Sequence, residues 1–571
     1  MKLIIFKGFF GILFLIMPGF ISAQTFLEAN PTAQKWADNT ASKLSRKQKI
    51  AQLMVIRVSE MQNGNVVFFD KQLEKDILKY NIGAICLFQG TAVEQAKILN
   101  KLQQKAKTPL MVCIDGETGL GMRFSDVETF PYQLTIGATN QPKLAYAVGN
   151  AIAKQCLRAG IQVNYAPVVD INNNPENPII NVRSFGEDKK KVTLFGVQMM
   201  KGMQDFGVMA CAKHFPGHGD VSVDSHLDLP VILKSKTQLD ALELYPFKSM
   251  IKEGVGSMMV AHLYIPSIDT TKNQATSLSH KNVTDLLKQE LRFKGLIFTD
   301  ALEMKGVAKF YPQGKAVTQS LIAGNDMLCL PGDIKGSIKD VKRAIREGKL
   351  SWADIDAKVN KVLLAKYNLK LAQFTPIDTA NITTDLNKDV NELKLKVYGQ
   401  AITLLKHDTA IKLPLTKQKR IAYVGFGIAS GNQLAKLLNV NVNADCFYLD
   451  YKAGQAKADS LLAQIGNNYD VVINGLHQYQ KYPANNFGIS NEALNLFNKL
   501  AKKPNSISFI FGNPYAIAKI VDARSLVACY EDDELMHQVV FDFLTGKLKP
   551  QGILPVSVSK EFSYGFGIAK R

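Results

Sequence analysis

The feature that most constrains the fold is an alternation, between residues 49 and 330, of short apolar runs with longer segments. Eight of the short runs are strand candidates: Ala51–Val55, Ile82–Phe88, Leu110–Ile114, Gln162–Tyr165, Val208–Ala212, Ser257–Ala261, Leu296–Thr299 and Asp326–Leu330. The segments between them have helical length and amphipathic patterns, as in Thr91–Lys105, Pro142–Ala159 and His280–Leu291. Apolar strands that alternate with helices are typical of a parallel sheet covered on its faces. Eight such repeats predict a (β/α)8 TIM-like barrel, with an open doubly wound sheet as the alternative.

The chain of 571 residues is longer than one ordinary core accommodates, and its C-terminal part predicts a second α/β domain. The strand candidates there are Ile421–Val424, Cys446–Tyr448, Val471–Ile473, Ser508–Phe511, Leu526–Cys529 and Leu554–Val556. The polar stretch 374–391, which contains Pro376, predicts a linker. We therefore expect a catalytic barrel domain over residues 24–373, a linker over 374–391 and a smaller three-layer αβα sandwich over 392–571.

The N-terminus has the pattern of a secretory signal peptide over residues 1–23. Lys2 and Lys7 are followed by the apolar stretch Gly8–Met17, and Ala23 supplies the small residue that cleavage requires. The apolar stretch is short for a membrane span, so an uncleaved anchor is the less favoured alternative. We expect an exported protein, periplasmic or secreted, with no stable membrane span after cleavage.

Composition and missing motifs exclude several classes of function. The net charge of +19 favours acidic partners, but Lys and Arg are scattered, so no nucleic-acid surface is predicted. The sequence has no P-loop, no GxSxG elbow and no HExxH helix, which disfavours phosphoryl transfer, serine hydrolysis and zinc peptidase chemistry. The seven cysteines form no CxxC pair and are predicted to be buried free thiols.

Charged and ring-nitrogen side chains follow nearly every strand candidate of the predicted barrel. They are Asp115, Glu117 and Arg123, then Asp170 and Arg183, then Lys213, His214 and His218, then Asp224 and His226, and finally His262 and Asp300. Active sites of parallel barrels form at the carboxyl ends of the strands, so these groups are expected to meet there. Pairs of carboxylates and cations suit the recognition of sugar hydroxyls. His214, His218 and His226 lie in a Pro-Gly loop without the spacing of a helical ligand pair, so no metal site and no cofactor are predicted.

Two motifs carry a resemblance to a known family. The run Lys213–Asp220, Lys-His-Phe-Pro-Gly-His-Gly-Asp, followed by Asp-Ser-His at 224–226, resembles the signature of the β-N-acetylglucosaminidase branch of glycoside hydrolase family 3. The run Asp300–Met304 resembles the nucleophile segment of that family, and Gly552–Val556 resembles the close of its second domain. One departure is visible, because Glu117–Leu120 reads Glu-Thr-Gly-Leu where the family commonly has Glu-Gly-Gly-Arg.

The resemblance implies a role for each matching residue. Asp300 matches the catalytic nucleophile, His226 the acid/base and Asp224 its partner. The positions that hold the terminal sugar are matched by Asp115, Arg123, Arg183, Lys213 and His214. Glu303 and Glu117 are the rival carboxylates for the nucleophile and the acid.

These residue types fit a retaining glycosidase. Such an enzyme places a nucleophile and an acid about 5–5.5 Å apart on opposite sides of the scissile bond. An aspartate at a strand end is held firmly for attack on the sugar carbon. Histidine, with an ordinary pKa of about 6.5, can both give and recover a proton near neutral pH. An aspartate two residues earlier would orient the ring, as in a serine protease triad.

The predicted function is retaining β-N-acetylhexosaminidase activity through a covalent glycosyl-aspartate intermediate. The expected substrate is a carbohydrate with terminal β-linked N-acetylglucosamine, such as a peptidoglycan fragment. Three alternatives stay open: a β-N-acetylglucosaminide phosphorylase, a β-glucosidase of the same family, and a glycan-binding protein without activity.

Overall fold

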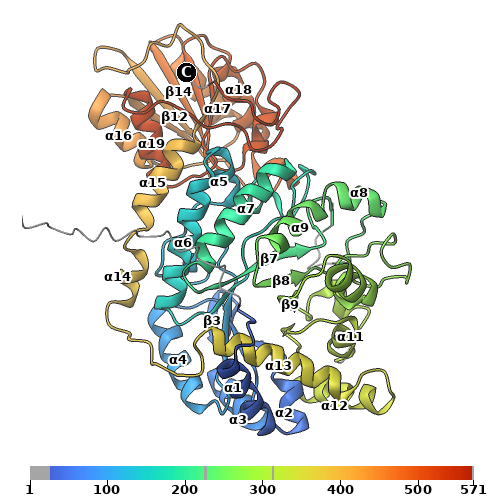
Figure 1. The fold of residues 1–571 in the computed structure, drawn as a ribbon. Coiled ribbons are helices and arrows are strands. Elements are labelled where there is room, and N and C mark those ends of the chain that lie inside the picture. The colour runs from blue at the N-terminus through green and yellow to red at the C-terminus, as the bar shows by residue number, and fades with distance from the viewer. Residues whose placement is uncertain (1–25, 224–227, 312–313, 569–571) are drawn as a thin grey trace, which may run out of the picture.

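The computed structural model describes residues 26–223, 228–311 and 314–568, which form two α/β parts (Figure 1). The predicted signal peptide and the predicted site residues Asp224 and His226 lie outside these ranges. Within the described ranges, each helix is either too short or too polar to span a lipid bilayer.

The N-terminal part is a ring of eight parallel strands. Its order is β10-β1-β4-β5-β6-β7-β8-β9. The strands are β1 (Met54–Arg57), β4 (Ala84–Leu87), β5 (Met111–Ile114), β6 (Val163–Asn164), β7 (Met209–Phe215), β8 (Ser257–Val260), β9 (Leu296–Thr299) and β10 (Leu328–Cys329). A parallel bridge between Phe298 and Met327 joins β9 to the approach of β10 and nearly closes the ring. The predicted barrel is confirmed, and the open doubly wound alternative is wrong for this part.

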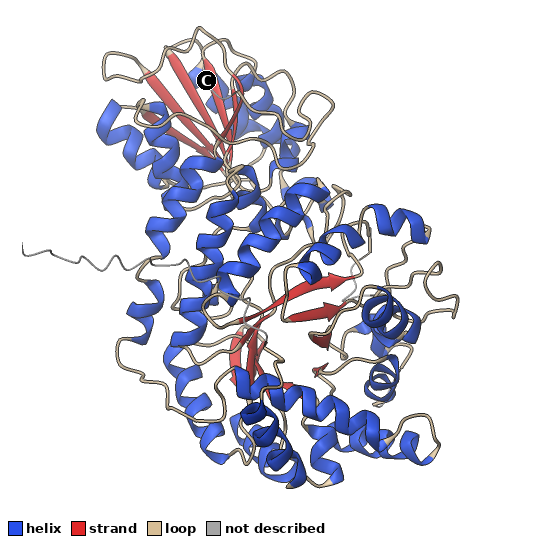
Figure 2. Cartoon of the chain, in the orientation of Figure 1, coloured by secondary structure: helices blue, strands red, loops and turns tan. Residues whose placement is uncertain are grey.

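Helices surround this ring on its outside (Figure 2). They are α1 (Pro31–Ser42), α2 (Arg46–Ala51), α3 (Asp70–Tyr80), α4 (Ala92–Lys105), α5 (Gln133–Ala138), α6 (Pro142–Arg158), α7 (Lys189–Gln204), α8 (Lys236–Ala241), α9 (Leu244–Lys252), the π-helix η4 (Lys281–Glu290), α10 (Lys305–Ala308), α11 (Lys315–Ala323), α12 (Ile334–Arg346) and α13 (Trp352–Asn368). Local sequence determines several of their starts. Thr91 and Glu94 form a capping box at α4, and Pro142 opens α6 at a position that needs no N–H donor.

One hairpin of the barrel part was not predicted. Strands β2 (Ser59–Gln62) and β3 (Asn65–Phe68) pair antiparallel between β1 and α3. Asn63 and Gly64 join them with φ angles of 50° and 81°. An Asn-Gly pair favours such a turn because both residues tolerate positive φ, so the signal was present in the sequence.

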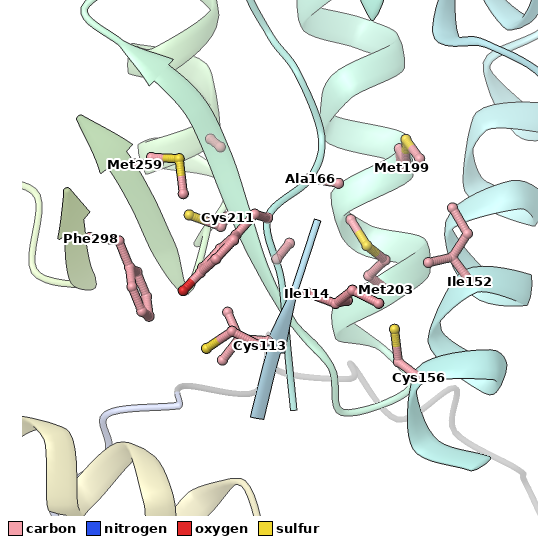
Figure 3. Packing of buried hydrophobic residues seen from close by; sticks show 14 of the residues in the cluster. Cys113, Ile114, Ile152, Cys156, Ala166, Met199, Met203, Cys211, Met259 and Phe298 are labelled. Atoms are coloured by element: carbon pink, nitrogen blue, oxygen red, sulfur yellow. The ribbon is translucent and has the colours of Figure 1, made fainter. Parts of the chain in front are cut away.

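Alternation along the strands separates the inside of the barrel from its helical coat. In Figure 3, Cys113 lies on the barrel side of β5, whereas Ile114 lies toward Met203 of α7. Inside, the rings of Tyr165 and Phe298 meet edge to face at 5.2 Å. All seven cysteines are free, and six of them are buried, as predicted.

The C-terminal part is a six-stranded sheet between two helical layers. The strand order is β11-β16-β15-β14-β12-β13, with only β11 antiparallel. The strands are β11 (Thr403–Lys406), β12 (Ile421–Phe426), β13 (Asp445–Leu449), β14 (Val471–Leu476), β15 (Ser506–Ile510) and β16 (Leu526–Ala528). The helices are α15 (Val390–Ala401), α16 (Gln433–Val442) and α19 (Glu534–Leu544), which pack together, and α17 (Gln455–Ile465) and α18 (Asn491–Ala501), which pack together. The predicted αβα sandwich is confirmed.

The sixth predicted strand of this sheet is wrong. Leu554–Val556 forms no strand, and β11, which sequence reasoning missed, takes the sixth place. Pro555 has no N–H to give to a sheet ladder. Its carbonyl instead accepts a hydrogen bond from the N–H of Glu187 in the barrel part, at 3.1 Å.

The predicted linker is a structured strap on the barrel. Residues 374–391 contain the helix α14 (Ile382–Asn387) and the first residues of α15. Asp126 of the barrel accepts a hydrogen bond from Thr383 at 2.8 Å, and Arg158 pairs with Asp385 at 2.8 Å. The sequence showed the polarity of this segment but not these contacts. The exact domain limits stay a prediction.

A largely buried carboxyl joins the two parts. Glu531, after β16, accepts hydrogen bonds from the N–H of Tyr132 at 2.8 Å and the hydroxyl of Thr135 at 2.6 Å. Burial raises the pKa of Glu531 from 4.5 to about 7, despite these donors. Between these two pH values the folded protein holds a proton that the unfolded chain has lost. The stability that depends on this group therefore falls as the pH rises from about 4.5 to 7.

Replacing Glu531 by Gln should remove this pH dependence. At pH 8 we expect Glu531→Gln to be more stable than wild type by about 2 kcal/mol, and at pH 5 by under about 1 kcal/mol. Thermal unfolding at the two pH values measures the difference. Glu534→Gln, at an exposed position of α19, is the matched control and should shift stability equally at both. A gap between Glu531→Gln and wild type that does not change with pH would contradict this account.

Candidate functional site

A cavity of about 510 Å³ opens at the carboxyl ends of the barrel strands. Six predicted site residues line it: Asp115, Arg123, Arg183, Lys213, His214 and Asp300. The wall also contains Glu117, Tyr132, His218, Met259, Lys481 and Tyr482. A larger cavity of about 700 Å³ lies beside residues 368–378, but none of the predicted site residues lines it. The guanidinium of Arg158 in that cavity already donates to residues 378–385. We therefore place the candidate active site in the smaller cavity.

Strand periodicity delivers three of these side chains to the cavity. Lys213 lies two residues after Cys211 in β7, and side chains two residues apart share one face of a strand. Asp115 and Asp300 stand one residue beyond β5 and β9, each two residues after an interior residue. The strands that build the barrel core therefore aim these groups into its mouth.

Lys213 is the buried centre of the site. Its side chain is 2% exposed, and its ammonium lies 2.8 Å from Asp115 Oδ1 and 2.6 Å from Glu117 Oε1. Burial works against the charge, but the two carboxylates outweigh it and raise the pKa of Lys213. Burial likewise opposes ionisation of Asp115, yet Lys213 and Arg123 hold the pKa of that carboxyl below its usual value. Lys213 and Asp115 are therefore both charged at neutral pH.

Glu117 and Arg183 form a two-pronged ion pair on one side of the cavity. Arg183 Nε lies 2.9 Å from Oε2, and Nη2 lies 2.7 Å from Oε1. Although burial favours the neutral acid, Arg183 and Lys213 lower the pKa of Glu117 well below its usual value. A carboxylate held ionised in this way is a poor proton donor, so the geometry disfavours Glu117 as the general acid.

Asp170 fixes the Lys-His-Phe-Pro-Gly-His loop from below. Its carboxylate lies 2.7 Å from His214 Nδ1 and accepts the N–H of His218 at 2.7 Å. His214 Nε2 then faces Arg183 Nη2 at 3.3 Å. Burial, together with the nearby His214, lowers the pKa of His218 to about 4, so this ring is neutral near pH 7. Sequence reasoning had noted Asp170 without assigning it this role.

Asp300 is the one of the two rival nucleophiles that lines the cavity. Its Oδ1 accepts the N–H of Ala301 at 2.8 Å. Burial opposes ionisation, but His262, His214, this N–H and Lys213 lower the pKa of Asp300 to about 2. His262 itself is fully buried behind the strand end, where it contacts Ser277 and the Ala301 carbonyl. Glu303 is instead paired with Arg57.

The predicted acid/base pair, His226 and Asp224, lies outside the described residues, so its role stays a prediction. Of the residues that precede it, His218 lines the cavity.

Potential metal ligands gather elsewhere. Among the described residues, one group of three lies close enough to share an ion: His477, Asp532 and His537 in the second domain. Asp532 Oδ1 lies 2.9 Å from His477 Nδ1 and 3.0 Å from His537 Nε2, so the two rings share this carboxylate as a hydrogen-bond acceptor. The group does not line the candidate active site.

Comparison with known proteins identifies the family. A model of the glycosyl hydrolase family 3 N terminal domain matches residues 45–365, more than half of the chain. The chain belongs to glycoside hydrolase family 3. The matched range includes every lining residue of the barrel and ends before the second domain, so that Lys481 and Tyr482 fall outside it.

Several curated proteins and one solved structure are similar to this family 3 chain. It is 34% identical to a beta-hexosaminidase A of Pseudoalteromonas piscicida over 62% of its own length and 64% of that relative. It is 25% identical to a beta-N-acetylglucosaminidase/beta-glucosidase of Cellulomonas fimi over 69% and 70% of the two chains. The structure of a family 3 beta-N-acetylglucosaminidase from Paenibacillus sp. str. FPU-7 superposes with a TM-score of 0.75 at 28% identity. That match covers 90% of this chain and 99% of the other.

The ion pair of Glu117 gives a test of its role. We expect Glu117→Gln to lower kcat/KM by about 100-fold, because it removes one anchor of Arg183 and Lys213. The loss should be the same for aryl glycosides with good and with poor leaving groups, since Glu117 does not protonate the leaving oxygen. Steady-state kinetics with 2,4-dinitrophenyl and 4-nitrophenyl substrates measure this. A loss confined to the poorer leaving group would identify Glu117 as the acid.

Proposed function

We propose that this protein is a retaining β-N-acetylhexosaminidase that removes terminal β-linked N-acetylglucosamine. The observation that carries the proposal is Asp300, ionised and held at the end of β9, in a cavity whose other charges are arranged in fixed pairs. An anionic carboxylate is the nucleophile that a double displacement at an anomeric carbon requires. The names of the relatives support the acetamido sugar as the substrate.

The paired charges suit the grip of a terminal sugar. Asp115 offers carboxylate oxygens to hydroxyl donors, and Arg123 and Lys213 offer N–H groups to hydroxyl oxygens. Arg183 adds further N–H donors, and one of them faces Nε2 of His214, the neighbour of Lys213 in β7, at 3.3 Å. Because each group is already fixed by a partner, little reorganisation is needed when the sugar binds.

The reaction then runs in two displacements. Asp300 attacks the anomeric carbon as the glycosidic C–O bond breaks, and His226 gives its proton to the leaving oxygen. Water next attacks the same carbon, His226 takes a proton from that water, and the bond to Asp300 breaks, which regenerates the carboxylate. In this proposal the role of Asp224 is to stabilise the charged form of His226.

The natural setting follows from the N-terminus and the charge. We propose export through the signal peptide of residues 1–23 and action on peptidoglycan fragments in the periplasm or outside the cell. The net charge of +19 supports attraction to acidic fragments of this kind.

Hydrolysis of 4-nitrophenyl glycosides tests the activity. We expect the β-N-acetylglucosaminide to be preferred over the β-glucoside, and Asp300→Ala to lower kcat by at least about 1,000-fold. Glu303→Gln, which removes the rival carboxylate near the same strand end, is the matched control and should keep most of the activity. Preference for the glucoside, or activity that survives Asp300→Ala, would refute the proposal.

Added inorganic phosphate separates hydrolysis from phosphorolysis. We expect free N-acetylglucosamine as the product with and without phosphate. Formation of the sugar 1-phosphate would instead support the phosphorylase alternative.

A further inference from the structure

The second domain contributes one wall of the active-site cavity. Lys481 and Tyr482 lie on the loop that follows β14, and both line the cavity together with the barrel residues. Loops at the carboxyl ends of adjacent parallel strands are where open α/β sheets bind ligands. The family model ends at residue 365, so the barrel match assigns no role to this wall.

The Lys481 loop, residues 477–483, is held by hydrogen bonds at its start and at Lys481 itself. Before it, Asp532 binds the N–H of Gln478 at 2.8 Å and the ring of His477 at 2.9 Å. After β15, the side chain of Asn513 donates to the Lys481 carbonyl at 2.7 Å and to Asn181 of the barrel at 2.8 Å. Asp532, which also binds His537, thus anchors the start of the loop. Asn513 connects the loop to the barrel segment that carries Arg183.

Lys481 differs from the other cations of the cavity. Arg123, Arg183 and Lys213 each form a salt bridge with a carboxylate at 3.1 Å or less. The ammonium of Lys481 instead lies 4.0 Å from the ring centre of Tyr132, and no salt bridge joins it to a described carboxylate. Burial, reinforced by the charge of Arg183 and only partly offset by Glu117 and Glu531, lowers the pKa of Lys481 to about 8. The group stays mostly protonated at neutral pH, with N–H donors in the cavity.

We propose that Lys481 binds a carboxylate on the saccharide substrate, so that the second domain gives the active site a preference for acidic glycans. This inference rests on the proposed glycosidase function and names the class of substrate more closely. Three carboxylates and four cations line the cavity, and Lys481 is the cation that this balance leaves over. A carboxylate on the substrate would attract the ammonium of Lys481 more strongly than the cation–π contact with the ring of Tyr132 does.

Two probes that differ in a single charge test the proposal. One is N-acetylglucosamine β-1,4-linked to N-acetylmuramic acid, whose lactyl group carries a carboxylate, and the other is its methyl ester. Binding to the Asp300→Ala protein is measured by calorimetry, so that the result does not depend on turnover. We expect the acid to bind about tenfold more tightly than the ester, and Lys481→Met to remove this difference while leaving ester binding within about threefold.

Control variants sharpen the test. Lys481→Arg should retain part of the preference for the acid, because it keeps the charge. Lys499→Met removes the same charge from an exposed position of α18 and should leave both affinities unchanged.

Each remaining outcome overturns the proposal. Equal binding of acid and ester to the Asp300→Ala protein means that Lys481 contacts no substrate carboxylate. An equal loss for both probes in Lys481→Met identifies Lys481 as a support of the wall or a contact for a hydroxyl. Binding of neither probe excludes this class of acidic glycan. Failure of the proposed function is distinguishable, because it appears as absent or glucoside-specific turnover by wild type whatever the binding ratio.

Discussion

The charged contacts of Lys213 are the interaction on which the rest of the site depends. An ammonium in the mouth of an apolar barrel is costly unless it is paired, and here Asp115 and Glu117 pair it at 2.8 and 2.6 Å. Each of these carboxylates then holds an arginine, Arg123 or Arg183. Removal of Asp115 or Glu117 would leave one arginine without its carboxylate and Lys213 with one partner instead of two. The network therefore fixes the positions of the proposed sugar-binding groups before any sugar binds.

The same electrostatics separates the roles of the carboxyl groups. Asp300 stands beside this network and near two histidines, and it is ionised, as a nucleophile must be. Glu117 is ionised too, but both of its oxygens are occupied by Arg183 and Lys213. Glu531 forms no salt bridge with a described cation, so burial outweighs the charge of Lys394 and raises its pKa to about 7. Burial is common to all three, and the nearby cations decide which way the pKa moves.

The barrel and most of its mouth could be predicted because periodicity and strand-end residues are local signals. Each of the eight apolar runs overlaps one strand of the ring, and the motif from Lys213 pointed to the candidate site. Contacts between distant segments left no such signal. The edge strand β11 depends on its pairing with β16, and α14 depends on its contacts with the barrel. Lys481 is positioned by contacts of its loop with Asp532 and Asn513. The run at Leu554 has a strand-like composition, but the carbonyl of Pro555 binds the N–H of Glu187 in the barrel instead of pairing within the sheet.

The central claim is that Asp300 becomes covalently bonded to the sugar. It is tested most directly by treating the enzyme with 5-fluoro-N-acetylglucosaminyl fluoride, which slows the second displacement, and locating the adduct by mass spectrometry of peptides. The account predicts one sugar per protein, on the peptide that contains Asp300, and loss of the label as activity returns. A label on another carboxylate, such as Glu117 or Glu303, would contradict it.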